Sequence, residues 1–360
     1  MKKFILAVCA LILIFPVISF YGCGNSKYSR TFYSFNATPV EVVIYGQDFS
    51  AELISEIETE LDSINQTYSA TKDGSIISQI NSLDFTQTTL SNEQALVFKS
   101  AKNLNEFTSN KFNPAVYPLV KAWSFSPNYP VLDFTPPSQD YITQTLSLDI
   151  TNFDNFVLDE NTATLTKLNP SSQIDLGGII KGYGADKISN ILYSHGITKG
   201  YISIGSSSLK TLKMNAVMIK HPEKTTDTIV KINLNKSNDF SISTSGDYER
   251  FYTYQGVKYA HIIDTDGKPY STGIISATVI TSSGIDADAL STALCLCEFN
   301  PNAENDELRD FISKISLDEK YAGAKIYAVY SKDNVKYLIT NEKQGENFTL
   351  LDNSFTIFEI

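Results

Sequence analysis

The sequence has 360 residues, of which 42% are hydrophobic, 19% charged and 12% aromatic. This composition excludes a disordered or low-complexity chain, because enough apolar surface is available to form a core. With 29 Lys and Arg against 40 Asp and Glu, the formal net charge is −11. No nucleic-acid partner is expected, since a groove that follows phosphates needs positive charge. An anionic small molecule would need a bound metal or helix N-termini to supply the positive potential.

The first 22 residues are expected to be a targeting segment. Two lysines precede an apolar run over Ile5–Phe20, which is the pattern of a signal peptide. The run is short for a membrane span and is interrupted by Pro16. The run ends in a glycine directly before Cys23, as at a bacterial lipoprotein cleavage site. We therefore expect a signal peptide over 1–22 and a lipid anchor on Cys23, at the extracytoplasmic face of a bacterial cell membrane. Ordinary secretion and an uncleaved anchor remain alternatives.

The rest of the chain is expected to be a polar tether over 23–35 followed by one domain over 36–360. No linker in the domain is long enough to separate independent parts. Cys295 and Cys297 lie in an apolar helical stretch and lack metal-ligand company. They are expected to be buried small hydrophobic residues rather than a disulfide or a metal site.

The first half of the domain reads as helices with few strands. Val40–Tyr45 is rich in β-branched residues and predicts a strand. Apolar spacing and caps predict helices that begin at Ser50, at about 92 and after Ser138, and residues 156–168 predict a hairpin. A glycine turn then leads into a helix over about 179–195.

The second half is mostly strand. Strands are predicted over about 200–204, 215–220, 228–234, 239–243, 250–263, 274–281, 324–330, 335–340 and 354–359. Helices are predicted over 286–298 and 306–316. Sequential strands with few crossover helices favour an α+β fold with antiparallel sheets over a doubly wound parallel fold.

The turn at Gly177-Gly178 is the first candidate site. Asp175 ends a strand, two glycines follow, and a helix containing Lys181 begins. Such a turn offers free N–H groups and the positive end of a helix to a phosphate. The alternative is that the glycines only permit a tight connection between strand and helix.

Three further polar clusters are candidates. Asp288 and Thr292 are four residues apart on a predicted helix, so their oxygens face the same way and suit a hard cation. Taken alone, an Asp and a Thr near a helix start are more often capping and surface groups. Ser243–Tyr248, which contains Ser245, Gly246 and Asp247, forms a polar turn that needs no function. His261 stands among polar residues close to Asp264, and histidine is the usual proton carrier near neutral pH.

Taken together and in this order, these clusters resemble the ApbE family, the FAD:protein FMN transferases. The likeness runs from about Thr38 to Leu296, and each segment alone is weak evidence. The matching segments are Thr67-Tyr68 with Ser75 and Asn81, Phe112–Val120 with Trp123, Phe134–Pro137, Asp175–Tyr183, Ser245–Tyr248, His261–Asp264 and Asp288–Thr292.

The resemblance implies an α+β enzyme with mostly antiparallel sheets and helices around a flavin cleft. It would use Mg²⁺ and take FAD as substrate. The reaction would transfer FMN to a Thr or Ser hydroxyl of an extracytoplasmic acceptor flavoprotein and release AMP. The family's acceptors carry an Asp-Gly-x-Thr/Ser-Thr/Ser segment, and Asp73-Gly74-Ser75 is this chain's nearest approach to one before Ile76 and Ile77 end the match.

The resemblance also implies roles for individual residues. The base that deprotonates the acceptor hydroxyl would be His261, with Asp264 orienting nearby groups. Mg²⁺ would be held by Asp288, Thr292 and the backbone carbonyl of Gly178. The residues implied in cofactor binding are Tyr68, Ala115, Asp175, Lys181, Ser245, Gly246, Asp247 and His261.

The chain departs from the family pattern around the expected cleft. Gly205–Ser208 replaces a Gly-Gly-Asn turn, Asp264–Pro269 is one residue shorter than the usual loop, and Asn113, Ala115 and Ile76 replace Asp, Thr and Glu. Two other functions therefore stay open. One is a Mg²⁺-dependent FAD pyrophosphatase that uses water as the acceptor, and the other is a flavin-binding lipoprotein without activity.

Overall fold

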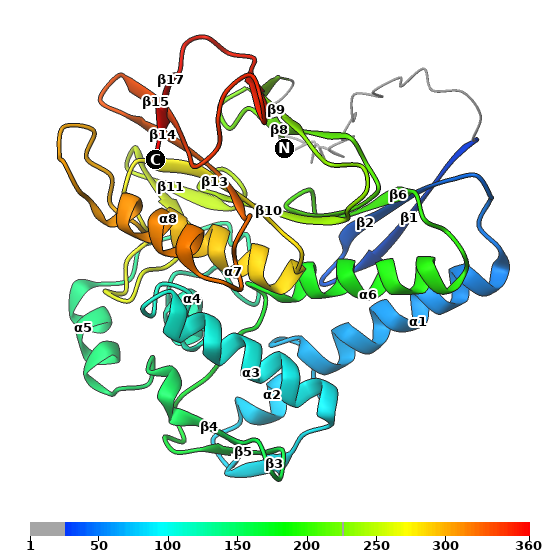
Figure 1. The fold of residues 1–360 in the computed structure, drawn as a ribbon. Coiled ribbons are helices and arrows are strands. Elements are labelled where there is room, and N and C mark those ends of the chain that lie inside the picture. The colour runs from blue at the N-terminus through cyan, green and yellow to red at the C-terminus, as the bar shows by residue number, and fades with distance from the viewer. Residues whose placement is uncertain (1–25, 225–226) are drawn as a thin grey trace, which may run out of the picture.

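The computed structural model describes residues 26–224 and 227–360, and a nine-stranded sheet forms their centre (Figure 1). Neighbouring strands are antiparallel, except that the last two in the order pair in parallel. The predicted α+β fold with mostly antiparallel sheets is confirmed. The strand order is β1 (Lys27–Ser34), β2 (Thr38–Tyr45), β6 (Gly200–Ile204), β7 (Ser208–Leu212), β10 (Phe240–Gly246), β13 (Ile274–Thr281), β14 (Lys325–Lys332), β15 (Val335–Thr340) and β17 (Thr356–Glu359).

Helices cover one face of this sheet (Figure 1). They are α1 (Ala51–Tyr68), α6 (Ile180–Ser194), α7 (Gly284–Cys295) and α8 (Glu307–Leu317). α1 buries residues at helical spacing, such as Leu53, Ile57 and Leu61, and leaves its other face to solvent. α7 is buried on nearly every side, so polar residues on it must find partners inside the protein.

The opposite face of the sheet carries a smaller antiparallel sheet, in the order β16 (Phe348–Leu350), β9 (Thr228–Asn233) and β8 (Ala216–Lys220). Buried side chains of the two sheets form one apolar layer between them, in which Ile229 and Ile232 of β9 join Ile280 of β13 and Tyr327 of β14. This layer fixes the back of the molecule and leaves the helical face to build the site.

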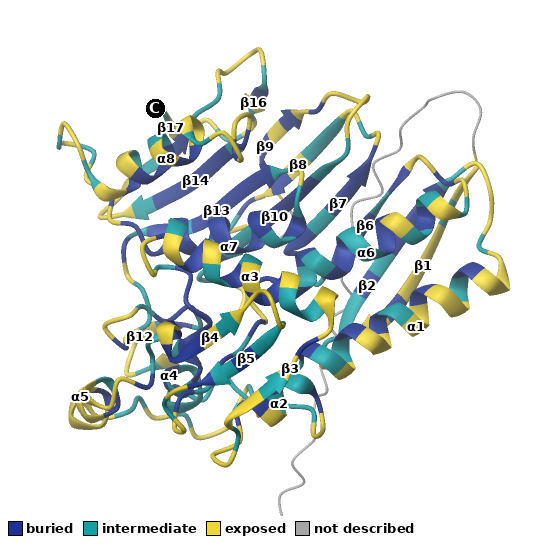
Figure 2. Ribbon diagram, turned by 60° about the horizontal axis from the view of Figure 1, so that its bottom comes forward, coloured by how far each residue is buried: buried dark blue, intermediate teal, exposed yellow. Residues whose placement is uncertain are grey.

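A second group of elements lies below the helices and forms what we call the helical lobe (Figure 2). Its helices are α2 (Ile76–Ile80), α3 (Asn92–Phe107), α4 (Tyr117–Ala122) and α5 (Gln139–Ser147), with short 3₁₀ helices over Pro114–Val116 and Phe153–Asn155. A small sheet in the order β3 (Gln87–Thr89), β5 (Thr164–Lys167) and β4 (Phe156–Asp159) and the hairpin of β11 (Phe251–Tyr254) with β12 (Val257–Ala260) complete the described elements.

The predicted tether is wrong for Lys27–Ser34, which pairs with β2 along its whole length as an edge strand. The reason is that buried and exposed side chains alternate at the end of this segment. Phe32 and Ser34 point inward, and the Ser34 hydroxyl donates to the carbonyl of Leu61 at 3.2 Å. The serines and tyrosines that suggested a tether lie largely on the exposed face. An edge strand that exposes one face to solvent has a largely polar sequence and therefore resembles a linker.

The single strand predicted over 250–263 is a hairpin instead. Gln255 and Gly256 adopt φ values of 50° and 80°, and this left-handed turn joins β11 to β12. The pair Cys295 and Cys297 is buried and free of disulfides, as predicted. Burial raises the pKa of the Cys295 thiol to about 12, which suits an inert core residue.

The segment 1–22 and Cys23 lie outside the described residues. Within the described part of the chain, no helix is both long and apolar enough to cross a bilayer.

Candidate functional site

A cavity of about 520 Å³ lies between the sheet's helices and the helical lobe. Its walls come from the end of α1, the turn before α6, the turn between β6 and β7, the end of β10, and α7. The lobe supplies residues between 111 and 117 and between 125 and 129. The fold therefore brings most of the separate sequence clusters to one place.

The turn before α6 is fixed at both ends. The Asp175 carboxylate accepts the backbone N–H of Gly177 at 2.8 Å. The backbone N–H of Asp175 donates to the carbonyl of Pro114 at 3.0 Å. A Cβ on Gly178 would lie 3.1 Å from the Phe112 ring, so glycine allows the backbone to run close to the lobe. α6 begins at Ile180, and its N-terminal end adds positive potential to the cavity wall.

Asn81 supports this turn from behind. Its side-chain amide donates to the carbonyl of Ile174 and accepts the N–H of Ile174, both at 2.8 Å. Ser75 caps α2 by accepting the N–H of Ser78. These two members of the matching segments therefore have structural roles in the described residues.

Asp288 is 3% exposed and lines the cavity from α7. Its Oδ1 accepts the hydroxyl of Ser208 at 2.7 Å, and its Oδ2 accepts the backbone N–H of Gly182 at 2.7 Å. Burial raises the pKa of this carboxyl, while Lys181 and the hydrogen-bond donors act in the opposite direction. The carboxylate is thus held in one orientation by a strand and a helix.

Thr292 lies one turn further along α7. Its Oγ1 donates to the backbone carbonyl of Asp288 at 3.0 Å and lies 3.2 Å from the Ser245 hydroxyl at the end of β10. β10 ends at the next residue, Gly246. A Cβ there would lie 2.9 Å from the carbonyl oxygen of Ile275 on β13, so only glycine fits at this position. Asp288, Thr292 and Ser245 present an oxygen-rich wall to the cavity.

His261 is half-buried and lines the same cavity. Its Nδ1 lies 3.1 Å from the backbone carbonyl of Arg250. A carbonyl only accepts, so Nδ1 carries the proton of the neutral ring and Nε2 keeps its lone pair. Burial lowers the pKa of His261 well below 6.5, and the Arg250 and Lys181 cations lower it further. The imidazole is therefore neutral at physiological pH.

Three cations line the cavity of this acidic protein. Lys181 donates to the Ser207 hydroxyl, and Lys111 pairs with Glu307 at 2.8 Å and donates to the carbonyl of Leu296. The Arg250 guanidinium lies 6.0 Å from the centre of the Tyr129 ring. The carboxylates of Asp175, Glu249 and Asp288 line the same cavity, so cations and carboxylates balance in its wall although the whole chain is acidic.

Most predicted site residues meet in this cavity. The predicted residues that line it are Tyr68, Asp175, Gly178, Lys181, Ser245, Gly246, His261, Asp288 and Thr292. The Tyr68 ring is largely buried and meets that of Tyr183 edge-on, with 5.7 Å between centroids.

Three predicted residues do not line the cavity. Ala115 is fully buried, and its N–H donates to Asn113. The Asp247 carboxylate pairs with Lys258 of β12 at 2.9 Å. The Asp264 carboxylate accepts the N–H and hydroxyl of Thr265 within its own turn. The proposed roles of these three residues in catalysis or cofactor binding therefore stay predictions.

Sequence reasoning missed several cavity residues. Glu249 and Arg250 directly follow the predicted turn Ser243–Tyr248 and could have been included with it. Ser207 and Ser208 stood out only as a departure from the family's turn. In the structure these two hydroxyls contact Lys181 and Asp288, so the altered turn contributes to the site.

The described residues contain no cluster of three or more His, Cys, Asp or Glu that would bind a metal through side chains alone. A cation in this cavity would have to use one carboxylate, a hydroxyl and backbone carbonyls. Such an oxygen set is typical of Mg²⁺, which also keeps water and substrate phosphates as ligands.

Comparison with known proteins gives consistent matches. The model of the ApbE family matches residues 37–305. The FAD:protein FMN transferase of Vibrio cholerae is 32% identical over 252 residues, which cover 68% of this chain and 73% of the relative. The FAD:protein FMN transferase of Salmonella typhimurium is 30% identical over 314 residues, which cover 79% and 85%.

Two solved structures share the fold. The ApbE protein of Thermotoga maritima superposes with a TM-score of 0.71 and 27% identity, over 85% of this chain and 94% of that chain. The flavin transferase ApbE of Vibrio cholerae superposes with a TM-score of 0.72 and 24% identity, over 88% and 97%.

Proposed function

This chain belongs to the ApbE family, and we propose that the cavity between the sheet's helices and the helical lobe is where it carries out the family's reaction. It is a transferase that moves FMN from FAD to a target protein. The observation that best supports the assignment is the meeting of nine predicted residues, from Tyr68 to Thr292, in one cavity.

The reaction has a simple balance of bonds. The oxygen of a Thr or Ser hydroxyl on the acceptor attacks the phosphorus on the FMN side of the pyrophosphate. A new P–O bond forms, the bond from that phosphorus to the bridging oxygen breaks, and AMP leaves with that oxygen. The hydroxyl proton must go to a base. Positioning and charge neutralisation supply most of the catalysis in phosphoryl transfer.

His261 is the proposed base. Its bond to the Arg250 carbonyl orients the ring and leaves Nε2 free to accept a proton. The lowered pKa keeps the ring unprotonated at neutral pH, which a base requires. Asp264 is proposed to act only indirectly, by fixing the turn that follows His261, because its carboxylate is bonded to Thr265.

The residues present fit a divalent cation. Asp288 is buried, and none of the ion pairs found among the described residues includes it, although Lys181 is near. A buried carboxylate in this state is stabilised by a bound cation. Asp288, the Thr292 hydroxyl and the Gly178 carbonyl would hold Mg²⁺, which supplies charge neutralisation for the pyrophosphate when bound.

Other cavity residues are proposed to bind the two ends of FAD. Lys181 and the N-terminal end of α6 provide positive potential for the phosphates. The Tyr68 ring offers a flat apolar surface to a flavin or adenine ring. Ser245 and Gly246 line the same cavity as Asp288 and Thr292 and are proposed to contact FAD there.

The first test separates transfer from FAD hydrolysis without needing the natural acceptor. The chain from residue 24 onward is incubated with FAD and Mg²⁺, with and without an acceptor that carries an Asp-Gly-x-Thr-Thr tag, and AMP and free FMN are quantified by chromatography. Transfer predicts AMP that rises with the acceptor and exceeds free FMN. Equal AMP and FMN, independent of the acceptor, would indicate a pyrophosphatase instead. Absence of both would indicate a flavin-binding protein without activity.

We also propose that the protein is anchored by lipid on Cys23 at the extracytoplasmic face of the membrane. The support is the apolar run Ile5–Phe20 followed by the glycine before Cys23. The mass of the mature N-terminal peptide tests this directly. An acylated Cys23 is expected, and an unmodified chain that starts at another residue would contradict it.

A further inference from the structure

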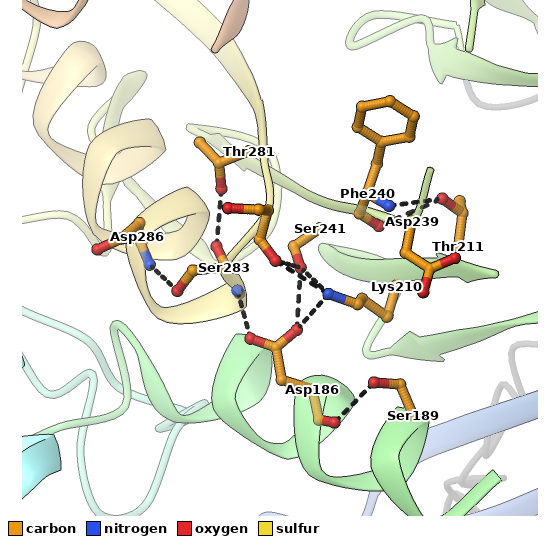
Figure 3. Close-up of polar contacts among 12 residues, drawn as sticks. Asp186, Ser189, Lys210, Thr211, Asp239, Phe240, Ser241, Thr281, Ser283 and Asp286 are labelled. Carbon is orange, nitrogen blue, oxygen red and sulfur yellow. Dashed lines mark hydrogen bonds and ion pairs between the residues drawn. The ribbon is translucent and has the colours of Figure 1, made fainter. Parts of the chain in front are cut away.

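A partly buried ion pair connects β7 to α6, close to where α6 meets the start of α7 (Figure 3). Lys210 of β7 is 7% exposed, and its Nζ lies 2.9 Å from Oδ1 of Asp186 on α6. Neither residue lines the cavity. The pair therefore needs an explanation other than contact with the substrate.

The pair ties four elements together (Figure 3). Lys210 also donates to the hydroxyl of Ser241 on β10 at 2.9 Å and to the carbonyl of Ser282, before α7, at 3.0 Å. An ammonium group has three donors, and all three are used. The second oxygen of Asp186 accepts the N–H of Gly284, the first residue of α7, at 2.6 Å.

This last bond mirrors the one that holds Asp288. Gly182 of α6 donates its N–H to Asp288 of α7, and Gly284 of α7 donates its N–H to Asp186 of α6. Each aspartate stands four residues after the glycine on its own helix. The two bonds therefore form a reciprocal pair one helical turn apart.

The two helices touch through their backbones between these bonds. A Cβ on Gly182 would lie 2.1 Å from the carbonyl oxygen of Gly284, and a Cβ on Gly284 would lie 2.1 Å from that of Gly182. A contact this close has no side chains to absorb a shift. Any rotation of α6 on α7 must therefore move the Gly182 N–H away from Asp288.

We propose that Asp186 and Lys210 are positioning residues that lock α6 onto α7 so that the Asp288 carboxylate and the Thr292 hydroxyl bind a divalent cation. This inference rests on the proposed function, in which Asp288 is a cation ligand. Partners behind a ligand typically change metal affinity by about 10- to 100-fold when they are removed.

The test measures binding of Mn²⁺ to the metal-free chain by electron paramagnetic resonance, without FAD or turnover. Asp186→Asn, which keeps the shape but loses the charge, is expected to weaken Mn²⁺ binding about tenfold. Lys210→Met is expected to weaken Mn²⁺ binding by a similar factor. The double variant should lose less binding free energy than the two single variants added together, because only the double variant leaves neither charge unpaired. Ser241→Ala removes shared hydrogen bonds without stranding a charge and is expected to weaken binding about threefold.

Tyr193→Phe is the matched control. Tyr193 lies on the same helix, two turns beyond Asp186, and its hydroxyl donates to Asp239 at 2.5 Å. This change also removes a tie between α6 and the sheet, but at the end far from Gly182. Wild-type Mn²⁺ affinity is expected.

The outcomes separate the two proposals. If wild type binds Mn²⁺, Asp288→Asn does not, and Asp186→Asn binds as wild type, the positioning role is overturned while the proposed cation site stands. Weakened binding in Tyr193→Phe equal to that in Asp186→Asn would also overturn the positioning role, because any loosening of α6 would then suffice.

If wild type itself binds no Mn²⁺, the proposed cation site is wrong and the positioning role is wrong with it. Should a charge variant not fold, unchanged Mn²⁺ affinity in Ser241→Ala overturns the proposal by itself.

Discussion

The backbone N–H of Gly182 donates to Oδ2 of Asp288 at 2.7 Å, across 106 residues of sequence. The bond connects the first turn of α6 to the second turn of α7, and the two helices pack without side chains between them at Gly182 and Gly284. The orientation of Asp288 therefore depends on a glycine of α6 as well as on Ser208 of β7.

The first prediction concerns Gly182. In an exposed helix, Gly→Ala stabilises by about 1 kcal/mol. At Gly182 the new Cβ meets the carbonyl of Gly284 at 2.1 Å, so Gly182→Ala is expected to destabilise by roughly 1–3 kcal/mol or more. Urea unfolding measures the change in the free energy of unfolding.

Gly184→Ala is the control for this prediction. Its Cβ would meet the ring of Phe35 at 3.2 Å and the methyl of Ile204 at 3.4 Å, which are side chains able to shift. A smaller loss than for Gly182→Ala is expected. Equal stability of Gly182→Ala and wild type would show that the helices separate easily here.

The second prediction concerns the charge of Asp288. Asp288→Asn keeps the volume but removes the proposed cation ligand, so Mg²⁺-dependent release of AMP is expected to fall by about 100-fold or more. Asp286→Asn is matched to it on the same helix, because Asp286 pairs with Lys320 at 2.8 Å outside the cavity. Steady-state assays over a range of Mg²⁺ concentrations should leave Asp286→Asn near wild type. Full activity of Asp288→Asn would rule out its role as a ligand.

The third prediction tests His261 as the base. His261→Ala should lower kcat by about 10²- to 10⁴-fold, the usual contribution of a general base, with the FAD dissociation constant changed only a few fold. His195→Ala serves as the control, since His195 pairs with Glu56 on the surface at 2.7 Å and does not line the cavity. An unchanged kcat would exclude His261 from the proton transfer.

The fourth prediction concerns pH. The pKa of His261 lies well below 6.5 because of burial first, and then the Arg250 and Lys181 cations. Activity should therefore persist below pH 6.5 and fall only when the imidazole takes up a proton. Arg250→Met removes one of the cations, raises the pKa of His261, and should move the acidic limb of kcat/KM to higher pH.

Lys258→Met provides the comparison for Arg250→Met. Lys258 is a nearby cation on the same hairpin, but it pairs with Asp247. Its removal should leave the acidic limb in place. A limb that stays fixed in Arg250→Met would mean that another group controls it.

Much of the fold can be predicted from periodicity and caps. Ser50, Ser91 and Ser138 each cap a helix that begins at the next residue, and most strands of the second half lie where β-branched residues predict them. The prediction of a tether fails at β1 because an edge strand that exposes one face resembles a polar linker. The predicted long strand over 250–263 fails because its turn depends on the left-handed conformation of Gln255 and Gly256.

The site is predictable in its backbone positions but less so in its side chains. Asp288 and His261 line the cavity, yet Asp247 and Asp264, from equally well-matched segments, bond elsewhere. The contribution of Ser208 could not be read from the sequence, because its partner Asp288 is 80 residues away. Long-range pairings of this kind depend on strand order, which local patterns do not encode.

The most direct test of the proposed transfer is the intact mass of an acceptor protein after incubation with the chain, FAD and Mg²⁺. The acceptor carries an Asp-Gly-x-Thr-Thr tag, and its competence is checked first with the FAD:protein FMN transferase of Vibrio cholerae. We expect a mass increase of one FMN moiety, one AMP released for each adduct, and no adduct when EDTA is present. An acceptor that the Vibrio enzyme modifies but this chain leaves unmodified, with or without release of AMP, would contradict the proposed function.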